Sequence, residues 1–149
     1  MNHSDYNEED MCNILKEYLK FHHKYEKIYD KMIVLMMVGQ FYEIYAVMND
    51  EIHVGPDITE VCDVLNMQFV KRNKKIKEIN FDNFLMAGFP DHAIVKFRNL
   101  LLSNGYTIII VDQITSPPNP ERDVVEILSP GTVLDNFNKQ DMNYLLSIF

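Results

Sequence analysis

Apolar residues change their spacing twice in the first third of the chain, and each change predicts a different element. Between residues 8 and 30 they recur every three or four positions, which predicts an amphipathic helix, with His22 on its apolar face. Residues 33–38 are then continuously apolar, the pattern of a strand buried on both faces. Gly39 interrupts this run, and a residue without Cβ allows a bend there.

The pattern downstream predicts further strands and helices of ordinary length. A helix capped by Asp57 or Thr59 is expected to run to about Asn66, and another from Pro90 to about Ser103, ending before Gly105. Strands are expected at 67–70, at 84–87 with an end at Gly88, at 106–112 and at 124–128, while 46–57 carries turn residues and is expected to be irregular. The predicted fold class is α/β (α+β), a mixed sheet of about five or six strands flanked by about three helices.

The residues that follow Gly39 carry the most distinctive chemistry. Residues two apart on a strand point the same way, so Phe41 and Glu43 share one face, and Tyr42 and Ile44 share the other. A flat ring with a carboxyl group two residues on is suited to a nucleic acid base. The ring can wedge between base steps from the minor groove, and the carboxyl group can hydrogen-bond the base edge. The alternative is that Phe41 is an ordinary core residue and Glu43 a solvated charge.

A series of motifs in a fixed order identifies a family resemblance. Gly39-Gln40-Phe41-Tyr42-Glu43 resembles the Gly-Asp-Phe-Tyr-Glu motif of the MutS mismatch-recognition domain (domain I), with Gln40 in place of the usual Asp. The further matches are Phe69-Val70-Lys71-Arg72, Met86-Ala87-Gly88-Phe89-Pro90-Asp91-His92-Ala93, Asn104-Gly105-Tyr106, Asp112-Gln113, Arg122-Asp123-Val124-Val125 and Ser129-Pro130-Gly131-Thr132. The resemblance covers roughly residues 18–149, and residues 46–57 look like an insertion.

The resemblance implies binding of double-stranded DNA that carries mispairs or small loops, in DNA mismatch repair. Phe41 would stack on the mispaired base and Glu43 would bond its edge, while Gly39 supplies the bend and Tyr42 anchors the motif. A base-edge bond from Glu43 tolerates different bases if its carboxyl group is protonated when needed, and nearby phosphates favour the proton. The composition, rich in Lys, Asn and Ile, suggests a divergent MutS of a large DNA virus or an organelle.

The resemblance also implies how the chain is divided and what it lacks. Residues 1–135 would form the mismatch-recognition domain, led by the helix at 8–30, and 136–149 would be a linker and the start of a truncated connector domain. No phosphate-binding loop of an ATPase is present, so this chain is not expected to be an enzyme, and no catalytic residue is assigned. ATP and magnesium are expected only in the absent ATPase domain, and a MutS-type dimer is expected to form through absent domains.

Lys71, Arg72, Lys74 and Lys75, with Lys77 close by, form the one dense basic cluster in the sequence. Such runs are often solvated loops. Lys71 and Arg72 match a basic turn of the family, which makes the cluster a candidate for phosphate contacts that set affinity and register without reading sequence.

The overall charge favours a second candidate function. The 149 residues carry a net charge of −8, although Lys and Arg supply most non-specific affinity for DNA. We therefore expect one of two functions. The chain either recognises the mispair while other domains supply the electrostatic affinity for DNA, or it is a MutS-like interaction module that has lost DNA reading. A metal-dependent nuclease is a third hypothesis. It requires clustered carboxylates with a lysine on adjacent strands, such as a Glu-x-Lys triplet, and the predicted strands carry no such triplet.

Cysteine and histidine usage adds little chemistry. The two cysteines have no CxxC partner and indicate an intracellular, reducing compartment, and the N-terminus has no secretory signal. The five histidines have no zinc spacing, so no metal site is assigned. The apolar runs are too short to cross a bilayer, so no membrane partner is expected.

Overall fold

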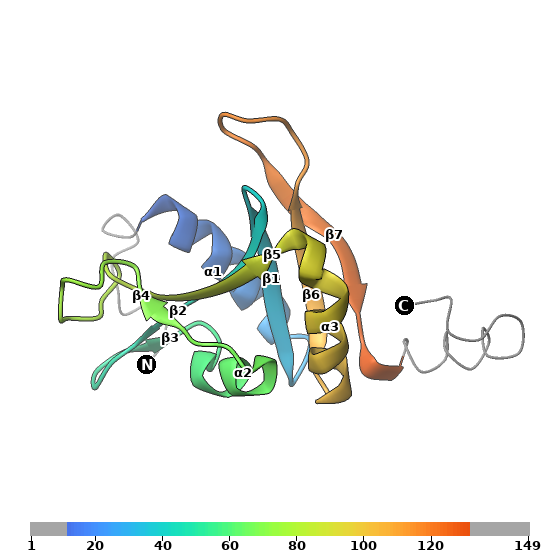
Figure 1. Cartoon of the computed structure of the whole chain (residues 1–149), viewed down its shortest axis with the longest axis horizontal. Coiled ribbons are helices and arrows are strands. Elements are labelled where there is room, and N and C mark those ends of the chain that lie inside the picture. Colours follow the sequence, from blue (N-terminus) through green and yellow to red (C-terminus); the bar gives the residue numbers. More distant parts are fainter. Residues whose placement is uncertain (1–11, 132–149) are drawn as a thin grey trace, which may run out of the picture.

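Three α-helices pack on one mixed β-sheet in the computed structural model, which describes residues 12–131 (Figure 1). The helices are α1 (Asn13–Glu26), α2 (Ile58–Leu65) and α3 (Ile94–Ser103), and a short 3-10 helix (Asp91–Ala93) precedes α3. The strands are β1 (Met32–Val38), β2 (Phe41–Met48), β3 (His53–Val54), β4 (Val70–Lys71), β5 (Leu85–Pro90), β6 (Thr107–Gln113) and β7 (Arg122–Leu128). The predicted fold class is confirmed.

The sheet runs in the order β4-β5-β2-β1-β6-β7, with β3 paired to the far end of β2. β1 pairs with β6 in parallel, and the other pairs are antiparallel. The first five residues of β1 are buried, as its continuous apolar run predicted. β1 is therefore a central strand, and the motif that follows it starts from a buried part of the sheet.

Two layers of helix cover the two faces of the sheet, with α1 behind it and α3 in front in Figure 1. On one face, Tyr18 of α1 donates a hydrogen bond to the Val34 carbonyl at 2.9 Å and meets the Tyr45 ring of β2 edge-on. On the other face, Phe89 of β5 stacks on Phe97 of α3, with ring centroids 4.4 Å apart. These contacts decide which face of β2 each functional side chain points to.

The three predicted helices are present, but α1 ends at Glu26 and not near residue 30, and α3 starts at Ile94, after the 3-10 helix, and not at Pro90. α1 begins at Asn13, and residues 8–11 of the predicted helix lie outside the described residues. Asp57 caps α2 by accepting the Glu60 N–H at 3.2 Å, one of the two caps expected. Gly105 follows α3 with a φ of +86°, as a helix-ending glycine should.

Three predicted segments were wrong in detail. Residues 46–57 are not irregular throughout, because β2 continues to Met48 and β3 pairs back on it through a turn closed by the Asn49 side chain. The strand expected at 67–70 is only Val70–Lys71, at the sheet edge. β5 does not end at Gly88 but runs through it to Pro90, since β2 pairs along its whole length.

None of the helices within residues 12–131 has the length and apolar character needed to cross a membrane. The linker and connector segment predicted at 136–149 lies outside the described residues, so its assignment stays a prediction.

Candidate nucleic-acid interface

The motif after β1 forms the turn and second strand of a tight β-hairpin. Val38 pairs with Phe41, so Gly39 and Gln40 alone make the turn. Gly39 has a φ of +62°, a left-handed conformation that two-residue hairpin turns require and that glycine adopts without strain. The bend predicted at Gly39 is therefore present, and it places Phe41 at the first position of β2.

Phe41 is exposed while its neighbour is anchored. Phe41 keeps 46% of its residue surface accessible, which is unusual for phenylalanine on a central strand. Tyr42, on the opposite face, is buried near Phe89, and its hydroxyl donates to Asp112 Oδ1 of β6 at 2.9 Å. The reading of Phe41 as an ordinary core residue is thus wrong, and its ring projects from a fixed backbone.

Glu43 lies on the same face as Phe41, partly buried on the α1 side of the sheet. The Tyr45 hydroxyl donates a hydrogen bond to Glu43 Oε1. Burial raises the pKa of Glu43 above its usual value, and the Tyr45 hydrogen bond and the Arg122 charge oppose this rise only in part. The protein's own burial thus favours the protonated carboxyl group before any phosphate is near.

Gly88 makes room for Glu43 on the neighbouring strand. The two residues are paired in the β2–β5 ladder. A Cβ at Gly88 would lie 2.8 Å from the Tyr42 carbonyl oxygen and 3.3 Å from Glu43 Cγ. Only glycine fits without moving the strand, so Gly88 holds the backbone position of Glu43.

A polar clamp grips the hairpin from β6 and β7. Gln113 Oε1 accepts the Gly39 N–H at 2.9 Å, and its Nε2 lies 3.4 Å from the Gly39 carbonyl. Arg122 donates from Nε to the Met37 carbonyl at 2.7 Å and forms a 2.8 Å ion pair with Glu17 of α1. Gln113 and Arg122 therefore fix the turn that carries Phe41, and we call the pair the hairpin clamp.

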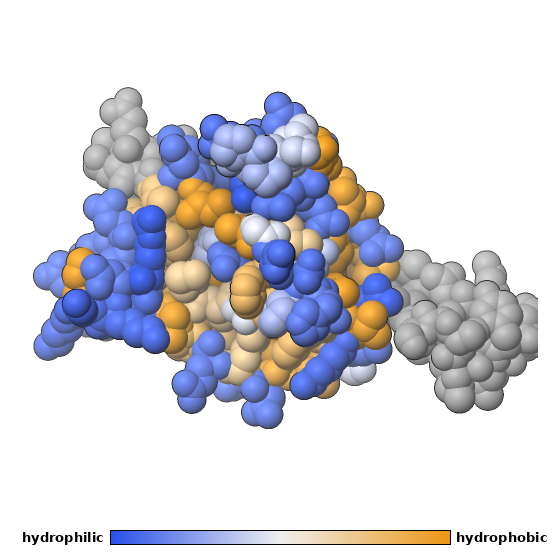
Figure 2. Space-filling view, turned by 45° about the horizontal axis from the view of Figure 1, so that its top comes forward, coloured by the Kyte–Doolittle hydropathy of each residue, from blue (hydrophilic) through white to orange (hydrophobic). Residues whose placement is uncertain are grey.

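The basic cluster occupies the edge of the sheet and the loop after it. Lys71 ends β4, and Arg72, Lys74 and Lys75 are exposed, with the Arg72 guanidinium 5.4 Å from the centre of the Phe84 ring. Figure 2 shows hydrophilic residues over the loop that projects at the left, where Figure 1 places the segment between β4 and β5.

One buried side chain gives this loop its shape. Asn83 accepts the Asn73 N–H at 2.7 Å and donates to the carbonyls of Glu78 at 2.7 Å and Ile76 at 3.2 Å. An amide has both donors and acceptors, so a single asparagine can close a loop that lacks a hydrophobic core of its own. The basic side chains are thereby carried on an ordered loop.

The structure does not bring the basic cluster next to Phe41. Lys71 pairs with Leu85, and Leu85 pairs with Ala46, whereas Phe41 lies at the other end of β2. Five residues along the strand and two strands across correspond to about 20 Å. The two predicted contact regions are therefore separate surfaces of one domain.

Sequence reasoning noted Gln113 and Arg122 as motif residues but gave them no role, and it did not anticipate Asn83 or the partner Tyr45. The signals were weak, because a polar residue at a strand end is common and only the tertiary pairing shows what it binds. The family matches at Gly88, Gln113 and Arg122 carried the only hint.

Comparison with known proteins identifies the family to which this chain is similar. The family model for MutS domain I matches residues 16–137. A mutS homologue of Acanthamoeba polyphaga mimivirus, named as a DNA mismatch repair protein, is 34% identical over 128 residues, which are 85% of this chain and 11% of that protein. DNA mismatch repair protein MutS of Streptococcus pneumoniae strain JJA is 30% identical over 129 residues, 83% of this chain and 14% of its own length.

The chain thus spans a small part of the curated relatives that it matches, 11% to 14% of their length. The matched region contains the hairpin, Gly88, the basic loop and both clamp residues. With the family model covering most of the chain, this chain belongs to the MutS family, and its residues 16–137 match domain I of that family.

Proposed function

We propose that this domain recognises mispaired or looped-out bases in double-stranded DNA by inserting Phe41 from the minor groove. The observation that carries the proposal is the exposed ring of Phe41 on an anchored hairpin. The relatives named as DNA mismatch repair proteins support the same role.

The physical basis of recognition is that a duplex with a mispair costs less free energy to deform than a matched duplex. Unstacking a base step costs a few kcal/mol, and a mispair has already lost part of that stacking. An aromatic ring stacked on a base returns about 1–3 kcal/mol. Insertion is therefore favoured where the duplex is already weak, so the domain measures deformability and not sequence.

Glu43 supplies the second contact, at the edge of the base on which Phe41 stacks. A protonated carboxyl group donates to the acceptors that line the minor groove, and an ionised one accepts from the guanine amino group. The raised pKa of Glu43 increases the share of the protonated form, which also lowers repulsion from the phosphates.

The phosphate grip is expected to come from two sources. Lys71, Arg72, Lys74 and Lys75 touch the backbone of the same duplex about 20 Å, or roughly six base-pair rises, away from Phe41. The remaining grip comes from further domains, since the net charge of −8 disfavours DNA. ATP, magnesium and the MutS-type dimer belong to those further domains.

A base analogue whose fluorescence rises on unstacking tests this function directly. We expect the chain at low salt, about 50 mM, to increase the fluorescence of 2-aminopurine placed in a mispair, and to leave a matched duplex unchanged. Equal fluorescence changes with both duplexes, or none at any protein concentration, would contradict it.

The second candidate is an interaction module of MutS type that no longer reads DNA, and the net charge of −8 is the observation in its favour. It predicts no difference between mispaired and matched duplexes even when the chain replaces the region that it matches in DNA mismatch repair protein MutS of Streptococcus pneumoniae.

A further inference from the structure

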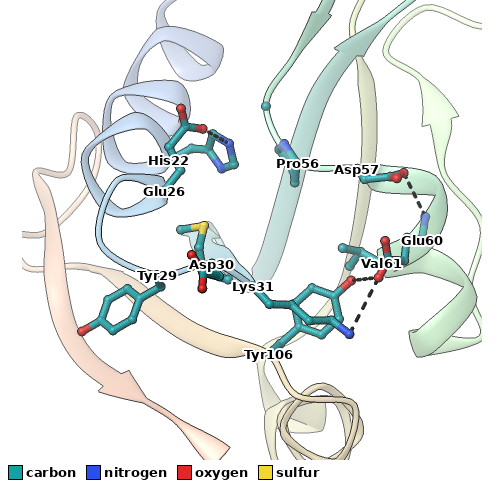
Figure 3. A pocket seen from close by; sticks show the side chains of 12 residues that line it. His22, Glu26, Tyr29, Asp30, Lys31, Pro56, Asp57, Glu60, Val61 and Tyr106 are labelled. Atoms are coloured by element: carbon teal, nitrogen blue, oxygen red, sulfur yellow. Dashed lines mark hydrogen bonds and ion pairs between the residues drawn. The ribbon is translucent and has the colours of Figure 1, made fainter.

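A cavity of about 470 Å³ (Figure 3) is lined by Lys31 and Met32 at the start of β1, and the hairpin turn follows the other end of that strand. His22 and Glu26 of α1 form one wall, and Asp57 and Glu60 of the α2 segment face them. Glu60 is already engaged, because it accepts from the Tyr106 hydroxyl at 3.0 Å and lies 3.9 Å from Lys31 Nζ. The side chains of the α1 wall, unlike Glu60, are not accounted for by contacts across the cavity.

Three metal-ligating side chains gather at this end of α1, and two of them, His22 and Glu26, line the cavity. His22 Nε2 lies 2.8 Å from Glu26 Oε2, and His23 Nδ1 lies 3.6 Å from Glu26 Oε1. One ligand atom from each residue falls within 4.8 Å of the other two. Spacings of four and three residues bring both histidines to the same carboxylate on the helix surface.

His22 is buried in a way that packing does not explain. Only 5% of its surface is exposed, and within the described part of the chain its Nδ1 has no hydrogen-bond partner. A buried polar atom left unpaired costs about 1–3 kcal/mol, and an apolar residue of similar size would avoid that cost. An unpaired nitrogen on so buried an imidazole points to a ligand at this site.

We propose that His22, His23 and Glu26 bind a divalent transition-metal ion of the zinc type. Two imidazoles and one carboxylate suit zinc or cobalt better than magnesium or calcium, which prefer oxygen ligands. Zinc sits about 2.0–2.2 Å from such donors, so side-chain rotation must bring the three atoms closer by about an ångström. Water or a neighbouring carboxylate completes the coordination.

The bound ion would act on α1 and not on DNA reading. All three ligands come from the last turns of α1, so the ion closes that end of the helix over the sheet. β1 separates the site from the turn at Gly39 by seven residues, about 20 Å. Spacing along the sequence gave no hint of the site, because adjacent histidines with a later glutamate match no common zinc pattern.

Titration with Zn²⁺ alone, followed by Co²⁺ for its visible absorption, tests the site on the metal-stripped 149-residue chain. We expect one ion per chain at micromolar concentration or below, and a higher melting temperature with the ion bound. Conversion of His23→Gln or Glu26→Gln should weaken binding at least about tenfold, since each removes a ligand. Both side chains are partly exposed, so both variants should fold.

The matched controls are His92→Gln, an exposed histidine before α3, and His3→Gln, the one histidine outside the described residues. Neither should change the affinity. The proposal is overturned if no stoichiometric binding occurs, if His23→Gln and Glu26→Gln bind as the wild type does, or if a control loses affinity equally. None of these measurements depends on mismatch binding. A negative result would therefore contradict the metal site without affecting the proposed function, and the reverse also holds.

Discussion

Glu43 is a carboxyl group held partly away from water on the same strand face as an exposed ring. Its folded-state pKa lies above its unfolded value, because burial outweighs the hydrogen bond from Tyr45 and the charge of Arg122. Ionised Glu43 therefore destabilises the fold, and the stability present below the unfolded pKa is lost as pH rises through the folded pKa.

The change Glu43→Gln removes this titration and keeps an oxygen that can accept from Tyr45. We expect the variant to melt at a higher temperature than wild type at about pH 8, and the difference to disappear at about pH 4. Thermal unfolding across this pH range measures it. A difference of constant size at every pH would mean that the charge of Glu43 is not what matters.

Gly88 is a second single residue that matters, because the absence of a side chain there lets β5 approach β2 closely. In Gly88→Ala the new Cβ meets the Tyr42 carbonyl oxygen at 2.8 Å, so β2 and β5 must move apart. We expect a loss of about 1–3 kcal/mol in the free energy of unfolding, the usual result of overpacking. Gly131→Ala, with no atom within 4 Å of its Cβ, is the control and should be close to neutral. Equal stabilities in urea titrations of the two variants would contradict the close approach.

At the scale of elements, the β1–β2 hairpin depends on groups from β6 and β7. A two-residue turn is stiff, but its tip needs tertiary contacts to stay in one position. Gln113 binds both backbone groups of Gly39, and Arg122 joins the Met37 carbonyl to Glu17 of α1. The position of Phe41 is therefore set by elements about seventy to eighty residues further along the chain.

Gln113→Ala should free the hairpin tip while leaving the fold intact. Loss of the hydrogen bond to the Gly39 N–H is worth about 1 kcal/mol, which corresponds to roughly fivefold faster hydrogen exchange at that amide. NMR exchange rates measure it, with the exposed Gln68→Ala as control. Unchanged exchange at Gly39 in Gln113→Ala would show that the clamp does not hold the turn.

Local pattern predicted most elements because their signals are local. The apolar run of β1, the Asp57 cap and the Gly39 turn each depend on neighbouring residues. β3 and the passage of β5 through Gly88 depend on pairing with β2, which no local pattern contains. Composition around Asn49 suggested a loop, although its side chain closes a hairpin.

At the scale of the whole molecule, two separate surfaces share one proposed ligand. Phe41 and the basic loop lie at opposite ends of β2, and the overall charge of −8 opposes contact with DNA elsewhere. The residue types of both surfaces were predictable from the sequence. Their separation was not, because it follows from the strand order β4-β5-β2.

The basic loop should contribute salt-dependent affinity without specificity. Replacement of Lys74, Lys75 and Lys77 by Ala should weaken matched and mispaired DNA equally and reduce the slope of log affinity against log salt by up to about 3. The measurement is fluorescence anisotropy at several salt concentrations.

The matched control removes three lysines from α1, Lys16, Lys20 and Lys24, which changes the net charge by the same amount. If both triple variants change the slope equally, the loop makes no specific phosphate contact and only the overall charge matters.

The central claim is that the exposed ring of Phe41 inserts into mispaired DNA, and a variant without this ring tests the claim most directly. The measurement is the ratio of affinities for mispaired and matched duplexes, with the chain in place of the region that it matches in MutS of Streptococcus pneumoniae. Phe41→Ala should reduce that ratio by about tenfold, since stacking contributes about 1–3 kcal/mol, and should leave matched affinity unchanged. Ile28→Ala, at an apolar residue with 62% exposure beyond the end of α1, should leave the ratio as in wild type. A ratio preserved in Phe41→Ala, or reduced equally in Ile28→Ala, would contradict the account.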